Sequence, residues 1–107
     1  METRVYEMTG ADQVKVKGII EANPYAPISF ARQGYKLKEG KGVGGDAGKY
    51  YLFIKGEPDF FKWADEQVKV AAIESFKRSE KPIEAKVIAS IEEEENAAEQ
   101  GMGAIFG

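Results

Sequence analysis

Residues 49–78 read KYYLFIKGEPDFFKWADEQVKVAAIESFKR, and this stretch carries the clearest structural pattern in the chain. Large apolar side chains at consecutive positions of Lys49–Lys55 are typical of a strand that is buried on both faces. Pro58 follows between two acidic residues, and this combination favours the first turn of a helix. We therefore predict a central β-strand over Lys49–Lys55 and a long helix from Pro58 to about Arg78.

The predicted helix has two different apolar faces. The wider face fits a sheet and is formed by Phe61, Ala64, Val68, Ala71, Ala72 and Phe76. Trp63 and Val70 lie on roughly the opposite side, with Ile73 nearby. Apolar side chains there indicate either a surface for a partner or a face that is covered by a loop or by the chain's own end.

Other segments alternate apolar and polar residues, which predicts half-buried strands. The alternating segments are Val14–Ala22 and Ile83–Ile91, and Thr3–Met8 is a further short candidate strand. Ile28–Lys38 is a long candidate strand that changes phase at Gly34, where we expect a bulge. The sequence thus predicts an α+β fold, an antiparallel sheet of about five strands with one long helix packed on a face. The expected interior includes Val14, Val16, Phe53, Val87 and Ala89.

Length and composition exclude several classes of protein. A chain of 107 residues suits one compact domain, which we place at residues 1–91, followed by an acidic tail at residues 92–107. The chain has no histidine and no cysteine, which excludes zinc-type Cys/His sites and histidine- or thiolate-based catalysis. No stretch approaches the roughly 18 apolar residues of a membrane span, and the first residues lack the apolar core of a signal peptide. We expect a cytoplasmic protein, and the excess of Glu and Lys over Asn and Gln is typical of heat-adapted organisms.

Charge is distributed unevenly along the chain. Residues 13–55 are net basic and residues 80–107 net acidic, within a total of −3. Aromatic residues alternate with part of the basic segment, so it is a candidate surface for single-stranded nucleic acid, formed by Lys36, Lys38, Lys49 and Lys55. The alternative is a solvated face, since Tyr35 and Leu37 fall on the opposite parity, and the net acidity favours this alternative.

The glycine-rich segment Gly40–Gly48 formally contains the spacing GxGxxG. That motif binds a pyrophosphate only between a strand and a following helix, whereas the next segment here is a predicted strand. A Walker A interpretation also fails, because Tyr50 stands where Ser or Thr would hold magnesium. We predict a hairpin loop that binds no nucleotide and is the most mobile internal segment.

No constellation of catalytic residues emerges from the sequence. The carboxylates Asp65 and Glu66 lie on the polar side of the predicted helix, with no burial to shift their pKa values towards catalysis. The run Glu92–Glu95 lacks the spacing and the turn glycine of a calcium loop. We therefore predict a protein that is not an enzyme, with no metal site and no cofactor.

The end of the chain, EEEENAAEQGMGAIFG at residues 92–107, resembles the C-terminal tail of archaeal ribosomal stalk proteins. In that family an acidic segment precedes a glycine-spaced apolar signature that inserts into a groove on translation GTPases. The resemblance implies that Met102, Ile105 and Phe106 bind a protein partner. It is confined to the tail, because residues 1–91 resemble neither form of stalk protein, the helical dimer or the much larger chain.

Elementary physical chemistry gives a similar interpretation of the tail. Four consecutive glutamates repel one another and glycines disfavour helix, so we expect little local structure before a partner binds. The main prediction is a non-catalytic adaptor whose tail contacts a protein, with a translation GTPase as a candidate. The alternatives are an RNA- or ribosome-associated module that uses the basic sheet, a small-ligand-binding domain, and a tail that folds back onto Trp63 and Val70.

Overall fold

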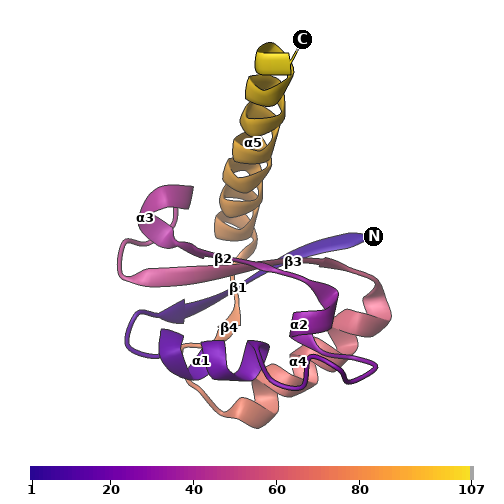
Figure 1. The fold of residues 1–107 in the computed structure, drawn as a ribbon. Helices are drawn as coiled ribbons and strands as arrows, with labels where there is room; N and C mark the ends of the chain where they lie inside the picture. Colours follow the sequence, from indigo (N-terminus) through magenta and orange to yellow (C-terminus); the bar gives the residue numbers. More distant parts are fainter. Residues whose placement is uncertain (107) are drawn as a thin grey trace.

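An antiparallel sheet forms the middle layer of the protein in the computed structural model (Figure 1). Its strands are β1 (Glu2–Thr9), β2 (Lys36–Glu39), β3 (Lys49–Gly56) and β4 (Lys77–Arg78), in the order β2-β3-β1-β4. Because β3 lies between β2 and β1, the predicted central strand is confirmed. The structure describes the backbone of residues 1–106 and the side chains of residues 1–97.

Helices lie on both faces of this sheet. They are α1 (Gln13–Ile20), α2 (Phe30–Gln33), α3 (Gly40–Val43), α4 (Pro58–Ala71) and α5 (Lys81–Phe106). The helices α1, α2 and α4 cover one face, and α3 and α5 lie on the other (Figure 1). The α+β class is confirmed. Within residues 1–106, however, the sheet has four strands where about five were predicted, and the protein has a second long helix, α5, that was not predicted.

The core beneath the first face is the larger of two clusters. It joins β1 and β3 to α4, through Tyr6, Leu52 and Ile54 on the sheet and Phe61 and Ala64 on the helix. Helix α4 begins at Pro58, as predicted. It ends at Ala71 instead of Arg78, because Ala72 adopts a left-handed conformation (φ 53°) and the chain then turns back to form β4.

The second cluster lies between the sheet and α5. Val5, Tyr51 and Phe53 point from β1 and β3 towards Val87 and Ile91 of the helix, and all of these side chains are buried. Phe53 does not pack against the helix face that contains Phe61. Successive residues of a strand point to opposite faces, so Phe53 belongs to the α5 side while Leu52 belongs to the α4 side.

Two predicted strands are helices. Val14–Ala22 corresponds to α1, and Ile83–Ile91 forms the first part of α5. Strict alternation also contains the spacing i, i+4, i+8, so Ile83, Val87 and Ile91 satisfy a helical stripe equally well. The helical geometry moves the intervening expected core residues outward: Val14 is 73% exposed and Ala89 is exposed.

The predicted strand Ile28–Lys38 is only half correct. Its first part is the short helix α2, whose first turn is capped by Ser29 Oγ accepting a hydrogen bond from the Arg32 N–H at 3.0 Å. Gly34, with φ 85°, ends that helix instead of forming a bulge, and β2 follows. Two residues in the sequence indicate this short helix: Ser29 is a favourable residue before a first turn, and Gly34 is a favourable residue after a last turn.

The glycine-rich segment connects β2 to β3 as a hairpin loop, as predicted, but it contains the helical turn α3. Gly40 and Gly45 are packed closely against the ring of Tyr51, and the Asp46 N–H donates a hydrogen bond to the Tyr51 hydroxyl at 2.9 Å. The first half of the loop is therefore held against β3.

Candidate interaction surfaces

Helix α5 is anchored at its first turn by a buried carboxylate. Glu84 accepts hydrogen bonds from Arg78 Nε and Nη2, both at 2.9 Å, and from the Val5 N–H at 3.0 Å. Burial alone would raise the pKa of Glu84, but these hydrogen bonds outweigh it and hold the pKa below its ordinary value. The contact joins α5 to β4 and β1, at one edge of the sheet.

From this anchor α5 crosses the sheet towards β2 at the opposite edge. Ile91 is the last buried side chain among the described residues of the helix. One turn further, Glu94 and Glu95 form ion pairs with Lys38 and Lys36 of β2. The Glu94–Lys38 distance is 3.6 Å, and the hydrogen bond from Lys36 holds the pKa of Glu95 below its ordinary value.

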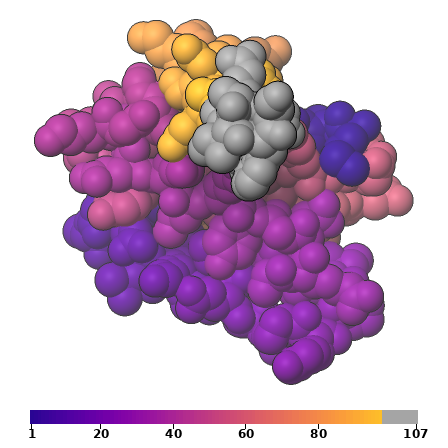
Figure 2. All heavy atoms as spheres, turned by 45° about the horizontal axis from the view of Figure 1, so that its top comes forward, coloured from indigo at the N-terminus to yellow at the C-terminus, as the bar shows by residue number. Residues whose placement is uncertain are grey.

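The four lysines of the candidate nucleic-acid surface share one face of the β2–β3 hairpin. Lys36 lies opposite Phe53 and Lys38 opposite Tyr51, and in β3 the lysines Lys49 and Lys55 share the parity of those aromatic residues. This is the face that α5 covers; Figure 2 shows the orange atoms of α5 beside the magenta atoms of β2 and α3. The sequence identified the lysines but not the carboxylates that meet them.

The remaining two lysines of this face differ in their surroundings. Lys49 donates a hydrogen bond to the buried carboxylate of Glu7 at 2.7 Å and lies 3.6 Å from Asp46. The bond to Glu7 raises the pKa of Lys49. Lys55 is exposed, and its ammonium group lies 5.7 Å from the centre of the Phe53 ring. Lys49 is thus part of the fold, whereas Lys55 is exposed beside Glu95 of α5.

The predicted tail corresponds to the second half of α5. The proposed domain boundary after Ile91 falls inside this helix, whose backbone continues to Phe106 and rises away from the body (Figure 1). The tail backbone is therefore helical, whereas the sequence predicts little local structure before a partner binds. The side chains of Met102, Ile105 and Phe106 lie outside the described residues. An anchored first turn explains the helix, because propagation adds a hydrogen bond per residue once nucleation is achieved.

The second candidate surface, Trp63, Val70 and Ile73, is divided. Trp63 is half buried against Phe30 and Phe60, with ring centroids 5.1 and 5.7 Å apart. Ile73 is partly buried at the core, and Val70 alone is largely exposed, at 76%. Phe30 of α2 packs against the tryptophan, so this part of the face contacts another element of the same chain.

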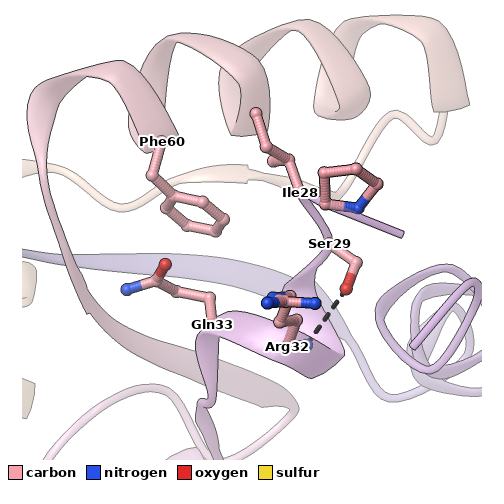
Figure 3. Close-up of a pocket in the computed structure, with 6 residues that line it drawn as sticks. Ile28, Ser29, Arg32, Gln33 and Phe60 are labelled. Carbon is pink, nitrogen blue, oxygen red and sulfur yellow. Dashed lines mark hydrogen bonds between the residues drawn. The ribbon is translucent and has the colours of Figure 1, made fainter. Parts of the chain in front are cut away.

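Two shallow depressions adjoin this aromatic group. Figure 3 shows the first, of about 270 Å³, between Phe60 of α4 and Arg32 and Gln33 of α2. The second, of about 520 Å³, shares Ile28 and Ser29 with it and reaches Trp63. Neither is lined by a buried carboxylate or lysine among the described side chains.

The carboxylate Asp65 has a structural role. It accepts hydrogen bonds from the Tyr6 hydroxyl at 2.8 Å and from Arg4 Nη1 at 3.0 Å, while Arg4 lies over the ring of Phe61. Burial and the bond to Asp65 raise the pKa of Tyr6, so its hydroxyl stays protonated as a donor. The group ties β1 to α4.

In the described part of the chain, no group of three or more acidic side chains could hold a metal ion. None of the helices described here is both long and apolar enough to cross a membrane. Comparison with known proteins finds no match of this chain to a family model, to a curated protein or to a solved structure.

Proposed function

We propose that the protein is a non-catalytic binding module that presents the end of helix α5 to a protein partner. The observation that carries this proposal is the length of α5. The helix contributes its last described buried side chain at Ile91, yet its backbone continues to Phe106 and projects from the body (Figure 1). Asn96 and Ala97, the last described side chains, are exposed.

The sequence of the projecting part continues the pattern of the anchored part. At about 100° per residue, positions 102, 105 and 106 fall on the same side of the helix as Val87 and Ile91. The apolar stripe that packs on the sheet at Val87 and Ile91 is thus repeated in the sequence beyond the glutamates, in the projecting part of the helix. The spacing i, i+3, i+4 is the one with which an amphipathic helix enters an apolar groove. The partner is therefore a protein with such a groove and a basic rim that complements the glutamates.

The stalk-like signature makes a translation GTPase the first partner to test. We expect titration calorimetry with purified translation GTPases to detect binding of modest affinity, because each apolar anchor contributes roughly 1.5–3 kcal/mol. Phe106→Ala is expected to weaken binding about tenfold or more.

The matched control is Gln100→Ala, which lies on the opposite side of the helix and should leave affinity unchanged. Both variants should melt within a few degrees of the wild type. If Phe106→Ala instead lowers the melting temperature by many degrees, the side chain belongs to the core and the proposal is wrong.

A further inference from the structure

We propose that the basic edge formed by Lys36, Lys38 and Lys55 is a binding site for single-stranded nucleic acid, and that Glu94 and Glu95 of α5 occupy this site in the structure. The acidic helix then acts as an internal competitor for the phosphates. This inference goes beyond the proposed function, because it needs no protein partner.

The shape of the site supports this assignment. A hollow of about 210 Å³ lies where β2, β3 and α5 meet, and it is lined by Tyr35, Lys36, Phe53, Lys55 and Glu95, together with Gln33 and Gly34. Phe53 is buried and Tyr35 is partly buried, so they give the hollow an apolar floor, and the ammonium groups that line it can contact phosphates. A third cation, Lys38, follows Lys36 along the same strand.

The charge distribution shows what the site is suited to hold. The Glu95 carboxylate bonds to the ammonium group of Lys36, and Lys55 also helps to lower its pKa. A carboxylate thus lies among cations, where a phosphate oxygen would lie in a complex. Lys36 and Lys38 are two residues apart on one strand, so their Cα atoms are separated by about 7 Å along it. A row of cations fits a polymer of phosphates better than a single small anion.

The covering contact is suited to exchange. The side chains of all four ion-paired residues are between 36% and 61% exposed, and exposed ion pairs are weak and sensitive to salt. Both glutamates follow Ile91 in α5. The helix can therefore release the two ion pairs while Val87 and Ile91 stay packed on the sheet. Opening the site therefore does not require unfolding the core.

The test compares two double variants of the full chain with equal charge changes. Glu94→Gln/Glu95→Gln removes the carboxylates that meet lysines, and Glu92→Gln/Glu93→Gln removes two exposed carboxylates that point away from the sheet. Binding of a fluorescent oligouridylate of about ten nucleotides is measured by anisotropy against salt concentration. Circular dichroism and melting curves verify that each variant is folded.

We expect Glu94→Gln/Glu95→Gln to bind about tenfold more tightly than the wild type, with a log–log salt slope near −2 for about three phosphates. The control pair should change affinity much less. Adding Lys36→Gln/Lys38→Gln to the first variant should abolish the gain. Equal tightening by both glutamate pairs would show an effect of net charge alone and overturn the proposal. Absence of binding by every folded variant, or equal affinity for a duplex of the same length, would also overturn it.

Discussion

Single side chains hold the layers of this protein together, and Glu84 is the clearest example. Its two carboxylate oxygens bind Arg78 from β4 and the backbone N–H of Val5 from β1, while the residue itself belongs to α5. An unpaired buried donor is costly, because it has lost water without gaining a partner. The junction of three elements therefore depends on one carboxylate.

Replacing this carboxylate is expected to destabilise the fold. Glu84→Ala leaves the Val5 N–H and Arg78 without their acceptor, and we expect a loss of about 2 kcal/mol in the free energy of unfolding. Urea denaturation measures this loss. Glu92→Ala, an exposed position of the same helix, is the control and should change stability by less than about 0.5 kcal/mol. A Glu84→Ala variant as stable as this control would contradict the assigned role.

The same carboxylate predicts a pH dependence. Its pKa is lowered in the folded protein, so its contribution is present above the ordinary glutamate pKa of about 4.3 and is lost as pH falls through the lower folded value. We expect Glu84→Gln to be less stable than the wild type near pH 7 and the difference to shrink in acid. Urea midpoints across this pH range, with Glu92→Gln as control, measure it. A difference that is constant with pH would contradict the prediction.

Two glycines of the β2–β3 loop, Gly40 and Gly42, differ in how closely other atoms surround them. A Cβ at Gly40 would lie 2.0 Å from the backbone oxygen of Asp46, whereas a Cβ at Gly42 would meet no atom within 4 Å. We expect Gly40→Ala to cost about 2 kcal/mol or more and Gly42→Ala to be neutral or slightly stabilising. Thermal melts compare the two variants. Equal effects would indicate that the first half of the loop is not packed as described.

At the scale of elements, the predictable features were those with local signals. The run Lys49–Lys55 and the proline-led start of α4 have one physical interpretation each, and the structure confirms both. The segments that form α1 and the start of α5 have two possible interpretations, strand and helix. Apolar residues at every second position also occur at every fourth position, which is a helical spacing. Tertiary packing decides between them. The basic residues of the candidate site were visible in the sequence, but their acidic partners come from a helix more than fifty residues away.

The geometry of α1 leads to a direct test of this distinction. In a strand, Val14 and Val16 would both point inward; in the helix, Val16 is fully buried and Val14 is 73% exposed. We expect Val16→Ala to cost about 2 kcal/mol and Val14→Ala less than about 0.5 kcal/mol. Urea denaturation of the two variants gives both values. Similar costs at the two positions would support the strand.

Over the whole molecule, the basic and the acidic segments of the sequence contact each other. The basic segment supplies β2 and part of β3, and the acidic end supplies the part of α5 that crosses above them. The small net charge of −3 therefore combines one basic and one acidic segment of opposite sign.

Truncation of the chain tests which part of α5 the folded core requires. A chain that ends at Ala97 keeps Val87, Ile91 and both ion pairs, so we expect it to fold and to melt within a few degrees of the full chain. A chain that ends at Lys86 loses two fully buried side chains and uncovers one face of the sheet, and we expect it to lose cooperative unfolding. Calorimetry distinguishes the outcomes. A strongly destabilised chain ending at Ala97 would place the end of α5 in the core.

Ile91 is the last described buried side chain of α5, so a bend of the helix at this residue would make it a pivot. From this pivot the helix extends about 22 Å to Phe106, whereas Glu95 lies only about 6 Å along the axis. A force applied at the tip by a bound protein would act on the ion pairs with a mechanical advantage of about three to four, from the ratio of these arms. A tilt of about 10° would displace the tip by about 4 Å and the Glu95 backbone by about 1 Å. Work done at the tip would thus be delivered to the row of lysines on β2.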